Sequence, residues 1–451
     1  MGTKLSSWQQ ELNGKRICVV GIGISHLPLI EYLTKHGAEV IACDRKTEQE
    51  LGETAQKLKQ SGVKLCLGEG YMDALDGDLI FKTPGLRPDV PALLDAARRG
   101  IPVTTEMEVF MDLCPATVTA VTGSDGKTTT TTLIYKLLSA AGYKTHVGGN
   151  IGAPLLPVID SIGADDKVVL ELSSFQLQTM RHSPSCAVVT NITPNHLDYH
   201  VDYQEYIDAK KNIFLHQKST DLLILNQDNE VTRSLAAKAK GRVLRFSRRG
   251  DADICLDGTD IFVKNERVLD IRDIAIPGMH NVENYMAAIG AVYGTVSQKE
   301  IETCAKTFGG VPHRIEFVRE LMGVRYYNSS IDSSPNRTIN TLSVFSEPVV
   351  LIAGGKDKGI PYDDLGPALA KHVKSLVLIG ATSKVIEEVA KKDAPHLPVF
   401  HASTYEEAVM LAKEQAESGD VVVLSNASTS FDLFKNFEER GNVFKDLVNR
   451  L

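Results

Sequence analysis

Apolar and polar positions along this chain fall into three successive blocks, in which short apolar runs alternate with stretches of helical periodicity. The first block has runs at 17–20, 39–43 and 79–81. Short runs rich in valine and isoleucine, separated by helical stretches, are typical of buried strands in parallel sheets. The pattern therefore predicts a first domain, residues 1–113, with a Rossmann-like parallel sheet.

The second and third blocks continue the alternation. The second begins with the run 117–121, and its later runs lie at 167–172, 187–191 and 222–225, followed by short extended runs near Leu244, Ile254, Ile261 and Val268. The third has runs at 349–353, 376–379, 399–400 and 421–424. We expect an α/β fold throughout, with a central α/β domain at 114–310 and a C-terminal Rossmann-like domain at 311–451.

Length and charge agree with several domains and restrict the partners. The chain has 451 residues, more than one hydrophobic core usually holds, and 43% of them are apolar. The net charge of −8 gives no bulk attraction to nucleic acid or to anionic lipid. We expect small-molecule substrates, no nucleic acid partner, and a monomer.

Cysteine usage and hydropathy indicate the compartment. The seven cysteines are widely spaced and form no C-x-x-C pair, which argues against a disulfide framework and a zinc site. The sequence has neither an N-terminal apolar segment nor a run of about eighteen apolar residues, so secretion and membrane spanning are not expected. These features favour the reducing cytoplasm.

A glycine loop opens the second block. The string TGSDGKTTT at 122–130 lies between the β-branched run 117–121 and a helical pattern at 131–141. In such a loop the backbone N–H groups and the helix N-terminus face an anion, a lysine reaches the outer phosphates, and a hydroxyl ligates Mg²⁺. Lys127 and Thr128 occupy those two positions. The string predicts a nucleoside triphosphate site and a P-loop ATPase-like fold for the central domain at 114–310.

The spacing of this loop departs from the usual G-x-x-x-x-G-K-[ST] pattern. Val121 stands where the first glycine is expected, and Gly123 takes its place. The alternative interpretation is a glycine turn that only connects a strand to a helix.

A second glycine turn follows the first strand. Gly21-Ile22-Gly23 resembles the start of a dinucleotide fingerprint, and Asp44 ends the next strand, where it could accept hydrogen bonds from a ribose or base. His26 replaces the third glycine, which favours a nucleotide diphosphate over a nicotinamide dinucleotide. A structural turn with a solvated aspartate is a further alternative. Thr83 offers a hydroxyl at the same edge of the sheet.

Polar residues at strand ends of the second block are candidates for chemistry. Glu171 ends an apolar strand, where Mg²⁺ bound to a triphosphate needs an oxygen ligand. His196 lies in a loop after another strand; taken alone, it is either a surface histidine or a functional one. Asn281 and Asn284 are three residues apart at a helix start and could grip a base edge or simply cap the helix.

Several strings together resemble the Mur ligase family of ATP-dependent amide-forming enzymes, over essentially the whole chain. They are TGSDGKTT at the glycine loop, 149–152, 171–176, 191–198 and 278–288. The family's shortened phosphate loop matches the departure at Val121. The C-terminal string 425–441 is most similar to members that add D-glutamate to UDP-N-acetylmuramoyl-L-alanine. The Asp-Asn-Pro-Arg string of the diaminopimelate- or lysine-adding relatives does not occur.

The resemblance implies that the γ-phosphoryl group of ATP activates the acid as an acyl phosphate, which the amine of D-glutamate then attacks. It assigns catalytic roles to Lys127, Glu171, His196 and Lys210, and it implies two Mg²⁺ ions with ligands from Thr128, Glu171, His196 and Lys210. Lys210 is implied to be carboxylated by CO₂, which turns a cation into an oxygen ligand. From the sequence alone, Lys210 is a solvated helix lysine.

The resemblance also implies three binding sites. The ATP site would comprise Gly123, Ser124, Asp125, Gly126, Lys127, Thr128, Thr129, Asn281, Asn284, Arg314 and Asp332. The UDP-substrate site would comprise Ile24, Ser25, Asp44, Arg45, Thr83, Asn150 and His196. The D-glutamate site would comprise Lys358, Ser430, Phe431 and Phe437, with Ser430 and Phe431 at a helix N-terminus, which favours an anion.

Three positions depart from the family pattern: Asp332, Asp125 and His26 in the first glycine turn. Two other classes of protein compete with the family assignment. Asp332 follows Asn328-Ser329-Ser330 where many members carry Asn-Asp-Ser, and Asp125 would repel a triphosphate unless it is turned away or metal-linked. A regulatory P-loop NTPase leaves the C-terminal string unexplained. A nicotinamide-dependent oxidoreductase explains only the first hundred residues.

Overall fold

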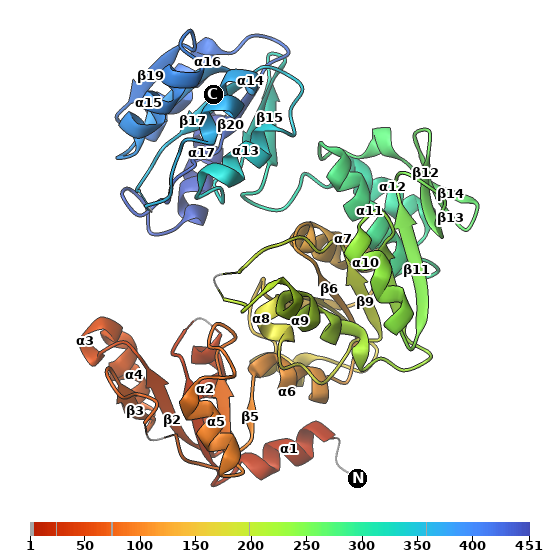
Figure 1. The fold of residues 1–451 in the computed structure, drawn as a ribbon, viewed down its shortest axis with the longest axis vertical. Helices are drawn as coiled ribbons and strands as arrows, with labels where there is room; N and C mark the ends of the chain where they lie inside the picture. The colour runs from red at the N-terminus through yellow and green to blue at the C-terminus, as the bar shows by residue number, and fades with distance from the viewer. Residues whose placement is uncertain (1–3, 24, 74, 198, 358) are drawn as a thin grey trace. The chain divides into compact units, whose positions relative to one another are not determined.

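The computed structural model describes residues 4–23, 25–73, 75–197, 199–357 and 359–451. The chain forms two compact units, the first of residues 1–271 and 283–304 and the second of residues 272–282 and 305–451. Helices and parallel strands alternate in both, so the predicted α/β class is confirmed (Figure 1).

The first unit begins with a five-stranded parallel sheet in the order β3-β2-β1-β4-β5. Its strands are β1 (Arg16–Val20), β2 (Glu39–Asp44), β3 (Lys64–Leu67), β4 (Leu79–Lys82) and β5 (Val103–Thr104). Its helices are α1 (Lys4–Leu12), α2 (His26–Lys35), α3 (Glu48–Leu51), α4 (Glu53–Gln60), α5 (Pro91–Arg98) and α6 (Glu106–Leu113). This order brings the carboxyl ends of β1, β2 and β4 together, where the loops after Val20, Asp44 and Lys82 leave the sheet.

A nine-stranded sheet completes the first unit, in the order β14-β13-β12-β11-β10-β9-β6-β8-β7. Its strands are β6 (Thr117–Thr122), β7 (Thr145–Gly149), β8 (Lys167–Glu171), β9 (Cys186–Val189), β10 (Leu222–Asn226), β11 (Arg242–Ser247), β12 (Ile254–Asp257), β13 (Asp260–Val263) and β14 (Glu266–Asp270). The strands from β7 to β12 are parallel, whereas β12, β13 and β14 form an antiparallel edge. The parallel part places the ends of β6, β8 and β9 side by side.

The helices associated with this sheet connect its strands and extend beyond β14. They are α7 (Lys127–Ala140), α8 (Ser174–Leu177), α9 (Tyr203–Leu215), α10 (Glu230–Leu235), α11 (Met279–Val292) and α12 (Gln298–Thr307), with 3-10 turns η1 (Leu156–Ser161), η2 (Ala236–Lys238) and η3 (Ile271–Asp273). Helix α7 follows β6 after four residues and packs against β6, β7 and β8. The glycine loop therefore lies at the carboxyl edge of the sheet.

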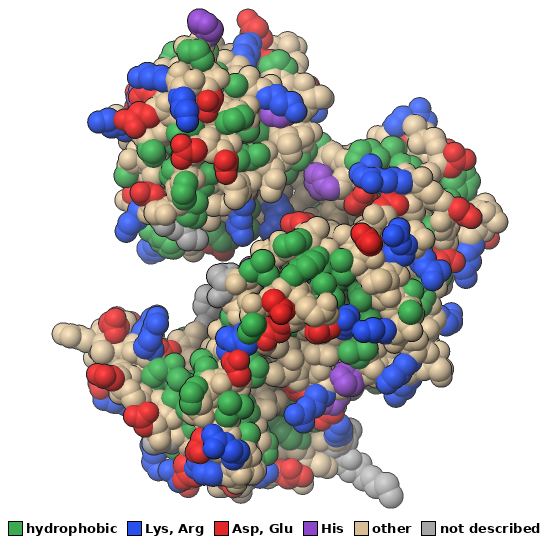
Figure 2. All heavy atoms as spheres, in the orientation of Figure 1, with side chains coloured by type: hydrophobic (Ala, Val, Ile, Leu, Met, Phe, Trp, Pro, Cys, Tyr) green, Lys and Arg blue, Asp and Glu red, His purple; other side chains and the backbone are tan. Residues whose placement is uncertain are grey.

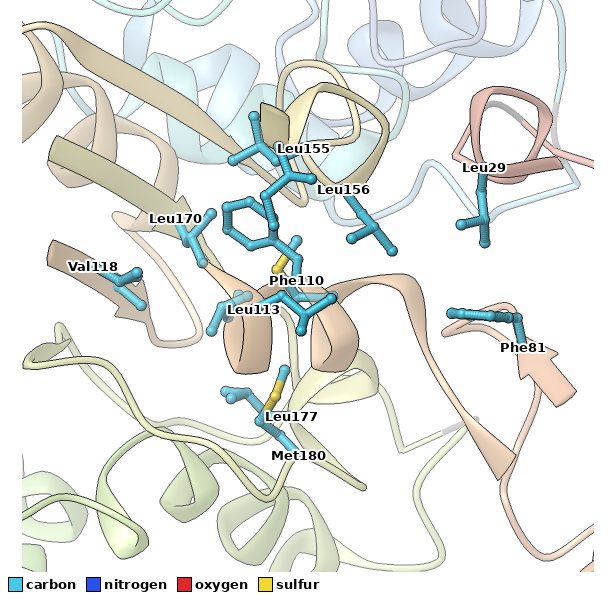
Figure 3. Close-up of a cluster of buried hydrophobic side chains, with 14 of the residues drawn as sticks. Leu29, Phe81, Phe110, Leu113, Val118, Leu155, Leu156, Leu170, Leu177 and Met180 are labelled. Atoms are coloured by element: carbon cyan, nitrogen blue, oxygen red, sulfur yellow. The ribbon is translucent and has the colours of Figure 1, made fainter. Parts of the chain in front are cut away.

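One hydrophobic core runs through both sheets of the first unit. Phe110 of α6 lies among Leu155, Leu156 and Leu170, and Met180 packs on the other side of the helix (Figure 3). Both α2 and α6 contact η1. Burying this apolar surface holds the first five-stranded sheet against the central one.

A buried carboxyl group stands inside this core. Glu106 is 7% exposed, and its carboxyl group accepts a hydrogen bond from the backbone N–H of Leu156 at 2.8 Å. Burial raises the pKa of Glu106 from 4.5 to about 7, because the charged form loses its hydration.

We expect Glu106 to make the first unit less stable as the pH rises. A raised carboxyl pKa gives a contribution that is fully present below pH 4.5 and is lost as the pH rises through about 7. The loss is on the order of 3 kcal/mol. Urea unfolding at pH 5 and pH 8 should show it in the natural chain and not in Glu106→Gln, whereas Glu11→Gln, on the exposed side of α1, should behave like the natural chain. An unchanged pH dependence in Glu106→Gln would contradict the assignment.

The second unit contains a six-stranded sheet in the order β15-β16-β20-β17-β18-β19, with only β15 antiparallel to its neighbour. Its strands are β15 (Glu316–Leu321), β16 (Val324–Asn328), β17 (Val349–Ala353), β18 (Val373–Ile379), β19 (Val399–Ala402) and β20 (Val421–Leu424). Its later helices are α13 (Pro335–Leu342), α14 (Leu365–His372), α15 (Ser383–Asp393), α16 (Tyr405–Gln415) and α17 (Phe437–Arg450). The loops after β16, β17 and β20 meet at one edge of this sheet.

The apolar runs predicted as strands are strands in the structure, but some strands have no matching prediction. The strands β3 and β7 have mostly half-buried residues, and β15 has only exposed and half-buried positions. Edge strands with solvent on one side lack the continuous apolar run that marks a central parallel strand. Their absence from the prediction follows from that composition.

Charge and hydropathy of the folded chain agree with the sequence. Acidic and basic side chains are interspersed over the visible face of the molecule (Figure 2). Among the described residues, the structure contains no helix that is both long and apolar enough to cross a bilayer.

Candidate active site

The glycine loop takes the geometry predicted for a phosphate loop. Gly126 caps the N-terminus of α7 in the left-handed region, at φ 77°, and a Cβ there would lie 2.3 Å from Oδ1 of Asn284. A Cβ on Gly123 would lie 1.9 Å from Oγ1 of Thr190. A Cβ would displace a neighbouring side chain at each position, and φ is positive at both, at 153° for Gly123 and 77° for Gly126, so glycine is favoured at each. The backbone can therefore curl with its N–H groups toward an anion.

Neighbouring segments hold the loop in place. Oγ of Ser124 donates to the Thr193 carbonyl at 2.9 Å and lies 2.9 Å from the hydroxyl of Tyr206. The backbone N–H of Asp125 donates to Oδ1 of Asn191 at 2.9 Å, and the Asp125 side chain is exposed. These bonds fix the loop before any ligand arrives, which lowers the entropy cost of binding.

Lys127 lies at the start of α7 and folds over the loop. Its Nζ donates to the carbonyl oxygens of Gly123 at 3.0 Å and Ser124 at 2.9 Å. A cation at this helix start stands beside the backbone N–H groups that attract an anion. The ammonium group is therefore placed within reach of the outer phosphates of a nucleotide in the loop.

Glu171 ends β8 next to the loop, as predicted. It is 1% exposed, and Oε1 accepts a hydrogen bond from Nδ2 of Asn150 at 2.7 Å. Its other oxygen, Oε2, is buried without a hydrogen-bond partner in the described part of the chain. A buried carboxylate oxygen that lacks a donor fits a divalent cation, so this residue suits the predicted Mg²⁺ ligand.

Lys210 is buried, and its interpretation as a solvated helix lysine is wrong. The residue is 1% exposed, and Nζ donates to the Gly123 carbonyl at 2.7 Å and to Oγ1 of Thr122 at 3.3 Å. Burial, and then the charge of Lys127, hold the pKa of Lys210 well below its usual value. The neutral amine, which is the form that reacts with CO₂, therefore persists to lower pH than in an ordinary lysine.

His196 lies on the loop before α9 with an exposed side chain and a positive φ of 54°. Its ring packs edge-on against Phe175, with the centroids 5.0 Å apart. The buried His200 lies behind it, 2.9 Å from Oγ of Ser174 and 3.3 Å from Glu205. Phe175 follows Glu171 by four residues, so the aromatic contacts tie the His196 loop to the end of β8.

An ion-pair network joins the first five-stranded sheet to the central sheet. The Arg87 guanidinium donates to both Glu205 oxygens, at 3.1 and 3.0 Å, and to both Asp89 oxygens, at 2.9 and 2.8 Å. The Tyr199 hydroxyl donates to the Pro84 carbonyl at 3.2 Å. The sequence gives no sign that Arg87 pairs with Glu205 or Tyr199 with Pro84, because the residues of each pair lie more than a hundred positions apart.

The predicted nucleotide residues of the first sheet gather around one pocket. Asp44, Arg45 and Thr83 line a pocket of about 270 Å³ at the carboxyl ends of β1, β2 and β4. The Asp44 carboxylate accepts hydrogen bonds from the N–H groups of Ile22 at 2.6 Å and Lys46 at 2.8 Å. Ser25 stands at the N-cap position of α2 without a capping hydrogen bond from its side chain, and Ile24 lies outside the described residues. The pocket has the position that a doubly wound sheet offers a ligand.

His26, which replaces the third glycine, has a structural place. The residue is 1% exposed, and Nδ1 lies 2.8 Å from the carbonyl oxygen of Gly21. Burial lowers the pKa of His26 to about 4, so the ring is neutral near pH 7. It ties the glycine turn to the start of α2.

The two predicted ATP-binding asparagines of α11 belong to different units. Asn284 lies in the first unit, where its Oδ1 accepts a hydrogen bond from Oγ1 of Thr130 at 3.3 Å beside the phosphate loop. Asn281 lies in the second unit, and its Nδ2 donates to the Pro277 carbonyl at 2.6 Å. Thr129 is buried in the first turn of α7.

Within the second unit, Asp332 is buried rather than presented to solvent. It is 5% exposed, and Oδ2 accepts hydrogen bonds from Thr341 at 2.7 Å and Ser425 at 2.8 Å. Burial raises the pKa of its carboxyl group. Arg314, further back along the chain, is half-buried.

The structure corrects the helix start expected at Ser430 and Phe431. Helix α17 begins at Phe437, and Asn436 is its cap, accepting from the Glu439 N–H at 2.8 Å. Ser430 is 3% exposed and Phe431 is 64% exposed, and both lie in a turn before the helix. The Asn436 cap stops the helix from extending back to Ser430. Lys358 lies outside the described residues.

Comparisons with known proteins agree over the length of the chain. Three domain models match in sequence order: a Mur ligase MurD-like N-terminal domain at 15–105, a Mur ligase middle domain at 121–292 and a Mur ligase glutamate ligase domain at 313–427. A protein of Ruminiclostridium cellulolyticum named UDP-N-acetylmuramoylalanine--D-glutamate ligase is 53% identical over 100% of both chains. A protein of the same name from Acetivibrio thermocellus is 52% identical, also over 100% of both chains. The chain is a member of the Mur ligase family.

Solved Mur ligase structures share the fold at low identity. MurF from Acinetobacter baumannii aligns with a TM-score of 0.61 and 18% identity, covering 96% of this chain and 93% of that one. UDP-N-acetylmuramate-alanine ligase MurC from Thermotoga maritima aligns with a TM-score of 0.60 and 19% identity, covering 97% and 99%.

In this Mur ligase, the described residues include no group of three or more His, Cys, Asp and Glu side chains arranged to hold a metal ion. Around the phosphate loop, Glu171 is instead accompanied by Lys127, Thr128 and Lys210. A cation there would need oxygen ligands from a nucleotide or from a modified lysine in addition to Glu171.

Proposed function

We propose that this Mur ligase joins D-glutamate to UDP-N-acetylmuramoyl-L-alanine with ATP, through an acyl phosphate, giving ADP and phosphate in peptidoglycan precursor synthesis. The observation that carries the chemistry is the meeting of Lys127, Glu171 and Lys210 at one phosphate loop. The named relatives, identical at about half of all positions, support the choice of substrates. The reaction belongs to the cytoplasm, where ATP and the nucleotide precursor are found.

The residues around the loop would have different roles in phosphoryl transfer. The loop amides and Lys127 hold the outer phosphates and oppose the charge that develops during transfer. Two Mg²⁺ ions, held by Thr128, Glu171, His196 and a carboxylated Lys210, would neutralise the rest of that charge when bound. The orphaned Oε2 of Glu171 supports the first of these sites. The exposed Asp125 side chain can turn away from the triphosphate.

Each of the three segments 1–113, 114–310 and 311–451 would bind one substrate. The first would hold the uridine diphosphate through Ile24, Ser25, Asp44, Arg45 and Thr83, with Asn150 and His196 reaching its sugar end. The second would bind ATP, aided by Asn281, Asn284, Arg314 and Asp332. The third would hold D-glutamate through Lys358, Ser430, Phe431 and Phe437. A monomer suffices for this arrangement.

The test is phosphate release from ATP in the presence of Mg²⁺ and UDP-N-acetylmuramoyl-L-alanine, with different amino acids. We expect release with D-glutamate and a ligated product by mass spectrometry, and little release with L-glutamate, L-lysine, glycine or no amino acid. Release that is indifferent to the amino acid would favour a nucleotide-binding relative with another role and would contradict the proposal.

A further inference from the structure

Arg440 is the largest side chain that is fully buried in the second unit. It is 1% exposed and lies in the first turn of α17. Its Nε donates to Oγ of Ser330 at 2.9 Å, Nη2 to the Ser330 carbonyl at 2.7 Å, and Nη1 to the Ser428 carbonyl at 3.2 Å. One guanidinium group therefore ties the loop after β16 to the loop after β20.

The charge of this arginine is not neutralised by an ion pair. All three of its hydrogen-bond acceptors are uncharged, and no described carboxylate lies within 4 Å of it. Asp432 and Asp332 act on it only through space. Tyr405, beside it, has a pKa raised to about 12 and is therefore neutral. Buried ions are normally paired, because removing one ion from water costs on the order of several kcal/mol.

The position in the helix increases this electrostatic cost. The N-terminus of a helix carries a partial positive charge, which disfavours a cation in its first turn. By contrast, Arg319 donates to the Val448 and Asn449 carbonyls at the C-terminal end of the same helix, at 3.2 and 3.1 Å, where a cation is favoured. The stability of the second unit alone therefore does not explain why a charged residue stands at position 440.

The loops that Arg440 supports converge at the carboxyl edge of the sheet. A Cβ on Gly355, after β17, would lie 3.3 Å from Nη1 of Arg440 and 2.3 Å from the Thr429 carbonyl. Lys356 and Thr429 exchange backbone hydrogen bonds at 2.9 and 3.1 Å. Oγ of Ser330 donates to the Phe437 carbonyl at 2.8 Å. The positive charge thus lies directly beneath the turn that contains Ser430.

We propose that Arg440 is a positioning residue for the amino-acid substrate, supplying from beneath the Ser428–Ser430 turn the positive charge that an anionic carboxylate at that turn would neutralise. The inference rests on the proposed function of this edge as the D-glutamate site. Arg440 does not touch the substrate, since it is buried; it holds the turn and attracts a carboxylate of the amino acid through it.

The test compares Arg440→Met, which removes the charge and keeps a similar apolar stem, with Arg440→Lys, which keeps the charge and loses the planar fork. We expect Arg440→Met to raise the KM for D-glutamate by about tenfold or more, with the KM values for ATP and the UDP substrate changing by less than about threefold. Arg440→Lys should lie nearer the natural enzyme. Arg319→Met is the matched control: this arginine lies in β15 and donates to the C-terminal end of α17, and its replacement should leave the KM for D-glutamate unchanged.

Other outcomes separate this inference from the proposed function. Equal effects of Arg440→Met and Arg440→Lys, or equal increases in all three KM values, would show a merely structural role and overturn the inference. If Arg440→Met does not fold, Arg440→Lys decides by the same comparison of KM values. A natural enzyme whose phosphate release does not depend on D-glutamate would refute the proposed function instead.

Discussion

Replacing Lys210 by alanine is expected to lower kcat by about a hundredfold to a thousandfold, the usual effect of removing a group that stabilises the charge developing in the transition state. The side chain is buried and its amine contacts the phosphate loop at the Gly123 carbonyl, 2.7 Å away. Carboxylation would convert this amine into an anionic oxygen ligand for Mg²⁺. Alanine offers neither the amine nor the carbamate, so the effect should fall on kcat more than on the KM for ATP.

The pH dependence of this activity has a definite direction. Burial and the charge of Lys127 lower the pKa of Lys210, so the neutral, CO₂-reactive amine persists to lower pH than for an ordinary lysine. Activity should fall as the pH drops through that lowered pKa, and removing bicarbonate should deepen the loss. Rates measured across pH with and without bicarbonate test this.

The neighbouring lysine provides the control for Lys210. Lys211 is also buried, at 7% exposure, and pairs with Asp208 at 2.5 Å on the same helix. Lys211→Ala removes an equivalent charge without touching the phosphate loop, and it should retain most of the natural kcat. Comparable losses in both variants would mean that the effect arises from α9 itself and would contradict the role of Lys210.

Lys127→Met is expected to reduce kcat/KM for ATP by about a hundredfold to a thousandfold. Its Nζ already lies on the phosphate loop, 3.0 Å from the Gly123 carbonyl and 2.9 Å from that of Ser124. Methionine keeps the apolar stem but removes the charge that opposes the γ-phosphoryl group during transfer. Phosphate release at varied ATP concentration measures the change.

The control for Lys127 lies on the same helix. Lys136→Met, in the third turn of α7 and away from the phosphate loop, should leave kcat/KM for ATP close to the natural value. An ATP affinity that is unaffected in Lys127→Met, as measured by calorimetry, would show that the ammonium group does not contact the nucleotide.

The parts of the site that depend on local sequence could be predicted. The phosphate loop is one continuous segment in which the glycine spacing, the preceding strand and the following helix all agree, and the structure has that arrangement at 122–130. Asp44 and Thr83 end parallel strands, and parallel strands bring their carboxyl ends to one edge, so these two residues line one pocket.

The parts that depend on distant contacts could not be predicted. Lys210 looks like any helix lysine until α9 packs beside β6 and brings it to Thr122, 88 positions away. Arg440 meets Ser330 across 110 positions, and no local pattern distinguishes it from a surface arginine. The helix start at Phe437 could have been predicted from the sequence, because Asn436 and Glu439 have the spacing of a helix cap.

The continuous core of the first unit has a consequence for the ancestry of such chains. Phe110 of α6 is enclosed by Leu155 and Leu156, which come from the segment after β7 (Figure 3). An exchange of the nucleotide-pocket module between two genes would therefore mismatch this interlocked surface unless the η1 segment travelled with it. In a chain packed in this way, the contacts around α6 constrain recombination, and the segment 1–113 is expected to diverge by point substitution at the rim of its pocket rather than by replacement of the whole segment.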